Sequence, residues 1–220
     1  MSGVDPQVTA RVRELPMLIP AAGEPPDDVG SGHPMREVTE RVARDRAAWD
    51  AELAADVGRR FEENSATWHL RHAEDRIAPL LDALDRGGDL RGPVVELGAG
   101  TGAGTELLVE RLGAVVAVDL AIGMLHRLRV PGASPVQADA SALPLPDRSV
   151  GTLVCLNMFL FADEVDRVLD PDGALVWVNS IGERTPIHLS AAAVADALGE
   201  GFRIVASRAA WGTWAVARRT

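Results

Sequence analysis

Three acidic residues and a run of glycines are the parts of this 220-residue sequence whose types and spacing point to ligand binding. Glu96 precedes the run Gly98-Ala99-Gly100-Thr101-Gly102, Asp119 comes 17 residues after Gly102, and Asp139 follows 20 residues later. Glycines allow a tight turn and a close approach of the backbone to a ligand. Carboxylates accept hydrogen bonds from hydroxyl and amino groups and attract positive charge. Together these residues could hold a polar, partly cationic molecule.

Each of these acids lies in or at the end of a short apolar segment that we expect to be a strand. Strands are expected over residues 94–97, 115–119 and 136–138, with helices over 104–112 and 121–128 between them. Alternating strands and helices with continuously apolar strands are typical of a parallel sheet covered on both faces. Ligands of such sheets bind beyond the carboxyl ends of the strands. The pattern therefore predicts that the three acids converge at one edge.

The rest of the chain divides into an N-terminal part and further strands. Residues 1–35 are rich in proline and glycine and are expected to be irregular. Residues 36–90 are expected to be mainly helical, with helices over 59–73 and 74–85, and residues 91–220 form the expected ligand-binding domain. Later strands are expected over 151–156, 174–178, 202–207 and 213–217, with a helix over 190–198. Because only a short turn at Trp211-Gly212 separates the last two strands, they should form an antiparallel hairpin.

The glycine loop has two interpretations. Gly98, Gly100 and Ala103 also satisfy the dinucleotide pattern GxGxxG/A, which is typical of NAD(P)-dependent oxidoreductases. Glu96, inside the strand, instead favours a ligand with a positive charge, such as a sulfonium or amino group. The sequence contains neither Tyr nor Lys, so the Tyr/Lys proton relay of short-chain oxidoreductases is not available. The oxidoreductase interpretation is disfavoured but stays open.

Four segments together resemble the class I S-adenosylmethionine-dependent methyltransferases, especially the small-molecule type of ubiquinone and menaquinone biosynthesis. Glu96 to Gly102 matches the ExGxGxG loop of that family, and Val118 to Leu125 is similar to its second element. Ala138 to Asp147 resembles the third element, and Arg167 to Leu175 resembles the segment before the fifth strand. The resemblance extends over roughly residues 75–220.

The resemblance implies a fold, a cofactor and a function. The fold is α/β, a Rossmann-like seven-stranded sheet of order 3-2-1-4-5-7-6 with the last strand antiparallel, helices on both faces and an N-terminal helical extension. The cofactor is S-adenosyl-L-methionine, the product is S-adenosyl-L-homocysteine, and no metal is required. Asp119 would bind the ribose, Met124 would pack near the adenine, and Asp139 would bind its amino group. The implied cofactor-binding residues are Glu96, Gly98, Ala99, Gly100, Asp119, Leu120, Met124, Asp139, Ala140 and Asn157.

The sequence assigns neither the methyl acceptor nor a catalytic residue. Polar and aromatic candidates near the acceptor are Asn157, Asn179, Ser180, Glu183, His188, Trp68, His69 and His72, although packing roles are favoured for His69 and His188. The segment between Leu156 and Arg167 is shorter than in the resembled family and implies a short helix after strand four. This difference, with the lack of a clear base, leaves a non-catalytic S-adenosylmethionine-binding protein as a further alternative.

Charge and hydropathy narrow the class of partner. The formal net charge is -10 and the arginines are scattered, which disfavours nucleic acid because phosphate binding needs clustered cations. A small-molecule acceptor is therefore expected. No apolar run approaches the roughly 20 residues of a membrane span, and Met1 to Glu14 lacks the apolar core of a secretory signal. The sequence predicts a cytoplasmic enzyme and carries no signal for its oligomeric state.

Overall fold

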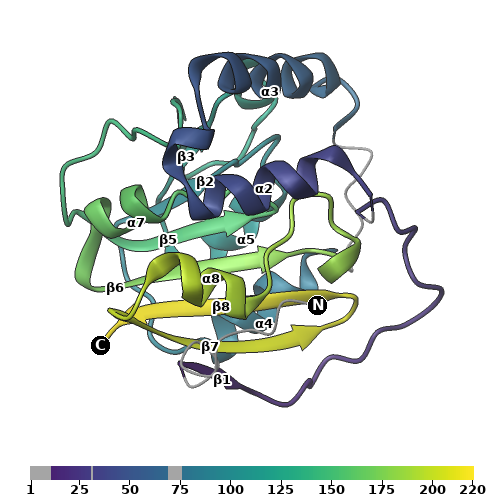
Figure 1. The fold of residues 1–220 in the computed structure, drawn as a ribbon, viewed down its shortest axis with the longest axis vertical. Coiled ribbons are helices and arrows are strands. Elements are labelled where there is room, and N and C mark those ends of the chain that lie inside the picture. Colours follow the sequence, from purple (N-terminus) through teal and green to yellow (C-terminus); the bar gives the residue numbers. More distant parts are fainter. Residues whose placement is uncertain (1–10, 31, 69–75) are drawn as a thin grey trace.

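The computed structural model describes residues 11–30, 32–68 and 76–220 of the chain. A single eight-stranded sheet runs through this part, with the strand order β1-β7-β8-β6-β5-β2-β3-β4 (Figure 1). The strands are β1 (Val12–Glu14), β2 (Val94–Leu97), β3 (Val115–Asp119), β4 (Ala133–Gln137), β5 (Val150–Leu156), β6 (Leu169–Asn179), β7 (Phe202–Ala209) and β8 (Gly212–Arg219).

Seven of these strands have the arrangement that the sequence and its resemblance predict. Strands β4, β3, β2, β5 and β6 pair in parallel, in the predicted order. Strand β8 lies between β6 and β7 and is antiparallel to both. The predicted C-terminal hairpin is confirmed, and Ala209 pairs with Gly212 at its closed end. The prediction of a Rossmann-like α/β sheet is therefore confirmed for all strands from β2 onward.

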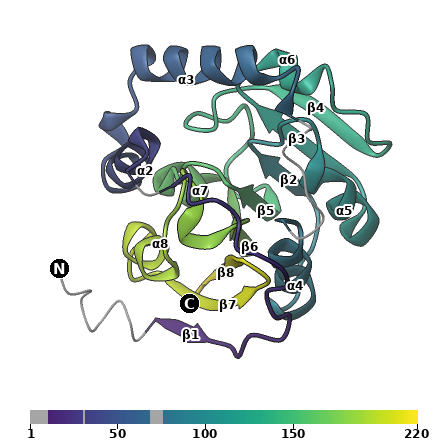
Figure 2. The same ribbon diagram turned by 90° about the vertical axis from the view of Figure 1, so that its right-hand side faces the viewer.

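The eighth strand corrects two predictions, the seven-stranded sheet and the irregular segment 1–35. Strand β1 pairs in parallel with β7, with Val12 opposite Ile204 and Glu14 opposite Ala206 (Figure 2). The sequence gives little sign of this strand because only one of its three residues is apolar. Its formation depends on hydrogen bonds to a segment about 190 residues away in the chain, which local patterns do not encode.

Helices cover both faces of the sheet, as predicted. One face is covered by α4 (Ala78–Arg86) and α5 (Ala103–Leu112), whose Leu80, Ala83 and Leu108 are buried against the sheet. The other face is covered by α7 (Ala162–Val168) and α8 (Ala191–Leu198). Helix α7 has seven residues, which confirms the short helix expected after the fourth strand of the parallel set. The one-turn helix α6 (Ile122–Leu125) is shorter than the predicted 121–128.

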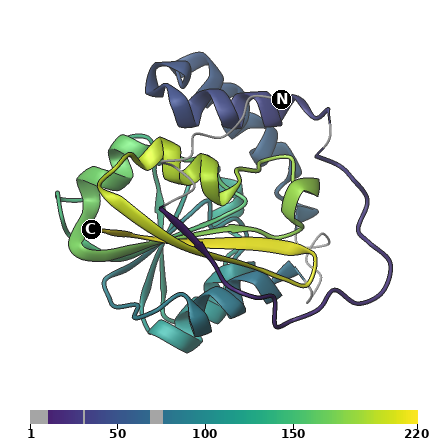
Figure 3. The same cartoon turned by 60° about the horizontal axis from the view of Figure 1, so that its bottom comes forward.

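The N-terminal helices form a further layer on the side of the sheet that α8 covers (Figure 3), and residues of this layer line a cavity at the carboxyl ends of the parallel strands. This layer contains α2 (Pro34–Arg44), the 3-10 helix η1 (Arg46–Ala48) and α3 (Ala51–Asn64). Asp50 caps α3 by accepting a hydrogen bond from the Leu53 amide, at 2.8 Å. Glu62 near the end of α3 accepts a hydrogen bond from the Gly123 amide, also at 2.8 Å, and so ties the layer to α6.

Parts of the predicted helices 59–73 and 74–85, including His69 and His72, lie outside the described residues. The N-terminal layer begins at Pro34, close to the predicted boundary at residue 36. The division of the chain into segments 1–35, 36–90 and 91–220 otherwise stays a prediction. In the part of the chain that the structure describes, no helix combines the length and the apolar character that crossing a bilayer requires.

Candidate functional site

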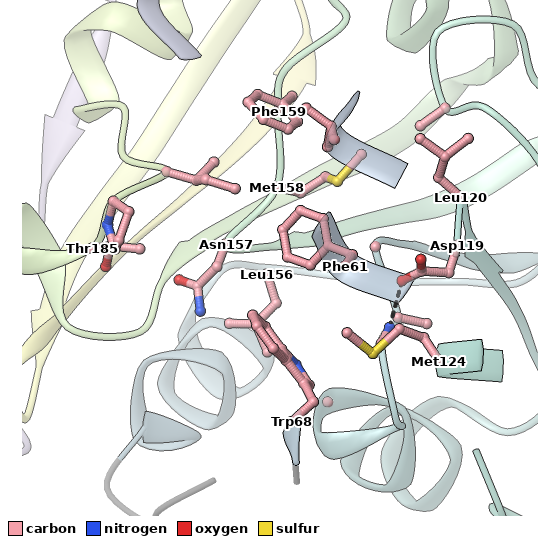
Figure 4. A pocket seen from close by; sticks show the side chains of 18 of the residues that line it. Phe61, Trp68, Asp119, Leu120, Met124, Leu156, Asn157, Met158, Phe159 and Thr185 are labelled. Atoms are coloured by element: carbon pink, nitrogen blue, oxygen red, sulfur yellow. Dashed lines mark hydrogen bonds between the residues drawn. The ribbon is translucent and has the colours of Figure 1, made fainter. Parts of the chain in front are cut away.

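A cavity of about 520 Å³ lies between the N-terminal layer and the carboxyl ends of the parallel strands. All ten residues predicted to bind a cofactor line it, from Glu96 in β2 to Asn157 after β5. In Figure 4, Asp119, Leu120 and Met124 lie on one side and Asn157 and Thr185 on the other. A volume of this size is typical of cavities that bind small molecules. The structure thus brings the predicted residues together, while their role in cofactor binding stays a prediction.

The glycine loop takes a conformation that requires glycine. Gly98, Gly100 and Gly102 have φ values of 69°, 57° and 99°, in the left-handed region that L side chains rarely adopt. A Cβ on Gly98 would lie 2.8 Å from Sδ of Met158. A Cβ on Gly100 would lie 3.3 Å from Nε1 of Trp68. Met158 and Trp68 thus pack against the two glycines, while Gly98 and Gly100 also line the cavity, so the loop backbone can approach a ligand held there.

Asp119 connects the loop to the end of the next strand. Its Oδ2 accepts a hydrogen bond from the Gly100 amide at 2.8 Å, and its Oδ1 accepts one from the Ala121 amide at 2.9 Å (Figure 4). Burial raises the pKa of Asp119 above its usual range, although these amide hydrogen bonds oppose the rise. Each oxygen has a second lone pair, so the carboxylate can still accept the hydroxyls of a ribose.

Glu96 lies beneath the loop and is almost fully buried, with 1% of its surface exposed. The Thr105 hydroxyl in α5 donates a hydrogen bond to its Oε2 at 2.5 Å. Burial raises the pKa of Glu96 to about 7, against the effect of the Thr105 hydrogen bond. A Cβ on Gly104 would lie 2.6 Å from Oε1 of Glu96, so the helix can pack here only because residue 104 is glycine.

We expect Glu96 to make the stability of the protein dependent on pH. The unfolded chain ionises this carboxyl near pH 4.5, whereas the folded chain holds the proton up to about pH 7. The protonated group therefore contributes stability that is fully present below pH 4.5 and is lost as the pH rises to 7. Between pH 4.5 and 7.5, the free energy of unfolding of the wild type should fall by about 3 kcal/mol relative to Glu96→Gln. Urea unfolding of both proteins at the two pH values measures this change, and a constant difference would contradict it.

Asp139 contacts the N-terminal layer. Its carboxylate accepts hydrogen bonds from Nε1 of Trp49, at 3.0 Å to Oδ2, and from the Ser141 amide, at 2.8 Å to Oδ1. The Trp49 ring also contacts Phe159 and Phe161, with ring centroids 5.2 and 5.3 Å apart. Trp49 thereby closes this end of the cavity with an aromatic wall. A lone pair of Asp139 stays available for an amino group such as that of adenine.

Asn157 adopts a left-handed backbone conformation, with φ of 52°, directly after β5. Its side-chain amide donates to the Ser180 hydroxyl at 2.9 Å and accepts from the Ser180 amide at 2.8 Å. This pair joins the ends of β5 and β6 next to the glycine loop. Both residues line the cavity, and Asn157 lies on the side away from Asp119 and Met124 (Figure 4).

Among the other candidates for the acceptor site, some line the cavity and others do not. His188 does not line the cavity; its Nδ1 accepts a hydrogen bond from Arg36 at 3.1 Å, and burial lowers its pKa to about 4. This fits the packing role favoured for it. Asn179 is buried and donates to the Leu189 carbonyl at 2.9 Å, and Glu183 also lies outside the cavity wall. Trp68 lines the cavity.

Apart from Trp68, the cavity-lining residues of the N-terminal layer and its continuation were not predicted from the sequence. Val57 and Phe61 in α3, Trp49 before it, and Arg76 just before α4 all line the cavity. The sequence predicted that this region is mainly helical but not which of its side chains face the sheet. No spacing in the sequence links Trp49 to Asp139, because their contact exists only after the layer folds onto the sheet.

Comparisons with known proteins agree with this geometry. Residues 95–177 match the family described as "Methyltransferase domain". The chain is 42% identical over 91 residues to trans-aconitate 2-methyltransferase of Methylobacterium nodulans, covering 37% of this chain and 35% of that protein. It is 36% identical over 110 residues to malonyl-[acyl-carrier protein] O-methyltransferase of Methylococcus capsulatus, covering 44% of this chain and 40% of that protein. The chain thus spans less than half the length of these curated relatives.

A solved structure shows the same fold. The fold resembles that of a SAM-dependent methyltransferase from Aquifex aeolicus, with a TM-score of 0.54 and 16% identity, over 77% of this chain and 98% of that one. The narrower resemblance to ubiquinone and menaquinone enzymes is not confirmed, since the relatives above carry other names. The glycine loop, the order of the strands and the matched segment agree with one another. The family match thus covers residues 95–177, and the fold around them is shared with an S-adenosylmethionine-dependent methyltransferase.

Proposed function

We propose that this protein transfers a methyl group from S-adenosyl-L-methionine to a small-molecule acceptor and releases S-adenosyl-L-homocysteine. The observation that supports this proposal best is the joint position of the glycine loop and Asp119. The loop exposes its backbone to the cavity, and the Asp119 carboxylate holds the Gly100 amide at 2.8 Å while facing the same space. A glycine loop fixed by a carboxylate suits a ribose and its 5′ substituent.

The lining residues suggest which part of the cofactor each would hold. Asp119 would accept the ribose hydroxyls, and Asp139 with Met124 would hold the adenine. Gly98, the first glycine of the loop, and Asn157, directly after β5, would hold the methionyl end. Glu96 would lie beneath that end, where a cationic ligand would favour the ionised form of its carboxyl. When bound, the cofactor supplies a methyl group that its sulfonium sulfur already activates.

The remaining work of the protein is to bind, orient and exclude water. An acceptor held beside Asn157 and Ser180 would meet the methyl group in line with its bond to sulfur. Alignment of this kind contributes up to about 7–11 kcal/mol to lowering a reaction barrier in favourable cases. The aromatic wall of Trp49, Phe159 and Phe161 would keep water from the adenine end.

Two alternatives make different predictions. The loop pattern also fits an NAD(P)-dependent oxidoreductase, and the short segment before α7 leaves open a protein that binds S-adenosylmethionine without catalysis. Titration calorimetry with S-adenosylhomocysteine and with NADH distinguishes the proposed methyltransferase from an oxidoreductase. We expect heat of binding with S-adenosylhomocysteine and none with NADH. Folded protein that gives no heat with millimolar S-adenosylhomocysteine would refute the proposal.

Transfer itself can be tested with an extract as the source of acceptors. Label from S-adenosyl-[methyl-³H]methionine should move into a small-molecule fraction with the wild type and not with Asp119→Ala. Binding without any transfer would favour the non-catalytic alternative. The names of the relatives, which refer to trans-aconitate and to malonyl-[acyl-carrier protein], support a carboxylic acid as one acceptor class to include. The cytoplasmic location is likewise a proposal, which fractionation of cells would test.

A further inference from the structure

Arg76 is a cation that lines the cavity and has no partner among the residues that the structure describes. It lies between the end of the N-terminal layer and α4, and it is half-buried. Within residues 11–30, 32–68 and 76–220, no hydrogen bond, ion pair or ring contact engages its side chain. A guanidinium stays charged at physiological pH, and partial burial without a partner costs free energy. Such a group is suited to a ligand that brings negative charge.

The packing of α4 indicates which end of the cavity Arg76 reaches. Leu80, four residues after Arg76, approaches the first turn of α5, directly after the glycine loop: its Cδ2 lies 3.5 Å from the position of a Cβ on Gly104. Cδ2 of Leu156 lies 3.2 Å from the same position. The start of α4 is therefore beside the ends of β2 and β5, next to Gly98 and Asn157, and not at the adenine end with Asp139.

The other charged groups of the cavity already have partners. Arg60 also lines it, but 63% of its side chain is exposed and its Nε pairs with Asp56 at 2.7 Å. The carboxylates of Glu96, Asp119 and Asp139 accept hydrogen bonds from Thr105, from backbone amides and from Trp49. Arg76 is thus a cavity-lining cation with its donors free among the residues that the structure describes.

We propose that Arg76 binds a carboxylate of a molecule held in the cavity, a proposal that rests on the proposed function. A planar guanidinium can form two parallel hydrogen bonds to a carboxylate, which fixes the orientation of the acid as well as its position. Two molecules could bring that carboxylate. One is the cofactor, through its methionyl end, and the other is the acceptor, which would then be an acid methylated beside Asn157.

The experiment compares Arg76→Gln with the wild type and with Arg59→Gln as a matched control. Arg59 is 61% exposed, pairs with Asp56 and does not line the cavity, so its replacement should leave binding unchanged. Calorimetry measures the affinity of each protein for S-adenosylhomocysteine and for 5′-methylthioadenosine, which lacks the methionyl carboxylate. Octanoate and octanol are then titrated into protein with and without saturating S-adenosylhomocysteine. Thermal melts and circular dichroism check that each variant is folded.

If the cofactor supplies the carboxylate, Arg76→Gln should weaken S-adenosylhomocysteine binding about 10- to 100-fold and leave 5′-methylthioadenosine within twofold. If the acceptor supplies it, both nucleosides should bind unchanged, while octanoate binding is lost and octanol is unaffected. Equal weakening of both nucleosides, or no change with any ligand, would overturn the proposal. A wild type that binds neither nucleoside would instead refute the proposed function, and the octanoate titration without cofactor would still test Arg76.

Discussion

Replacing Asp119 by alanine is expected to weaken S-adenosylhomocysteine binding by at least about 100-fold. The carboxylate would contribute twice to that affinity, by accepting the ribose hydroxyls and by holding the Gly100 and Ala121 amides at 2.8 and 2.9 Å. Hydrogen bonds to a charged group contribute about 1.5–3 kcal/mol each, so losing two of them gives an effect of this size. Titration calorimetry on the purified variant measures it.

The control for this prediction is Asp196→Asn, an exposed acid on α8. This substitution removes the same charge from the chain at a position away from the cavity. The variant should therefore bind S-adenosylhomocysteine as tightly as the wild type. Asp119→Asn keeps the size of the side chain but places an amide NH₂ against one backbone donor, so it should fall between wild type and alanine. Binding by Asp119→Ala within threefold of the wild type would contradict the assignment of Asp119.

Replacing Asp82 by alanine is expected to lower the free energy of unfolding by about 3–5 kcal/mol. Asp82 in α4 is 3% exposed and holds two donors from different elements. Its Oδ2 accepts from Nη1 of Arg86 at 2.8 Å and from Nε1 of Trp214 in β8 at 2.7 Å. Alanine would leave a largely buried guanidinium with only the Pro16 carbonyl as a hydrogen-bond partner and a buried indole NH with none, which is more costly than losing a surface pair.

Asp85 on the same helix provides the matched control. It pairs with Arg111 at the surface, and 48% of its side chain is exposed. Pairs of this kind contribute about 0–1 kcal/mol, so Asp85→Ala should change stability little. Urea unfolding at pH 7 compares both variants with the wild type. Similar losses of unfolding free energy for the two variants would show that the hydrogen bonds among Asp82, Arg86 and Trp214 do not account for the loss of stability.

Much of the fold was predictable because its signals are local. The central strands β2, β3 and β5 are short apolar runs, and residues 94–97 of β2 are all buried. The edge strand β4 is more polar and exposed, and it spans Ala133–Gln137 instead of the predicted 136–138. Turns with glycine or proline separate the strands from the helices. The parallel order followed from resemblance and agreed with this alternation. The hairpin of β7 and β8 was predictable because two residues, Ala210 and Trp211, close it.

The parts that the sequence missed depend on contacts between distant segments. Strand β1 forms only against β7, and η1 brings Trp49 to Asp139 across 90 residues of chain. Arg76 has no motif around it, so only the position of α4 shows that its side chain lies at the cavity. The helix predicted over 121–128 is a single turn, because α6 ends at Leu125.

The sequence by itself determined the sheet from β2 to β8, the glycine loop and the convergence of Glu96, Asp119 and Asp139 on one edge. These features arise from residue types with strong local preferences, in a fold where the carboxyl ends of parallel strands share an edge. Only the tertiary structure decided what lies opposite that edge. The aromatic wall, the cation at Arg76 and the edge strand β1 form when segments far apart in the chain pack together, and such packing depends on shape and burial that no short pattern records.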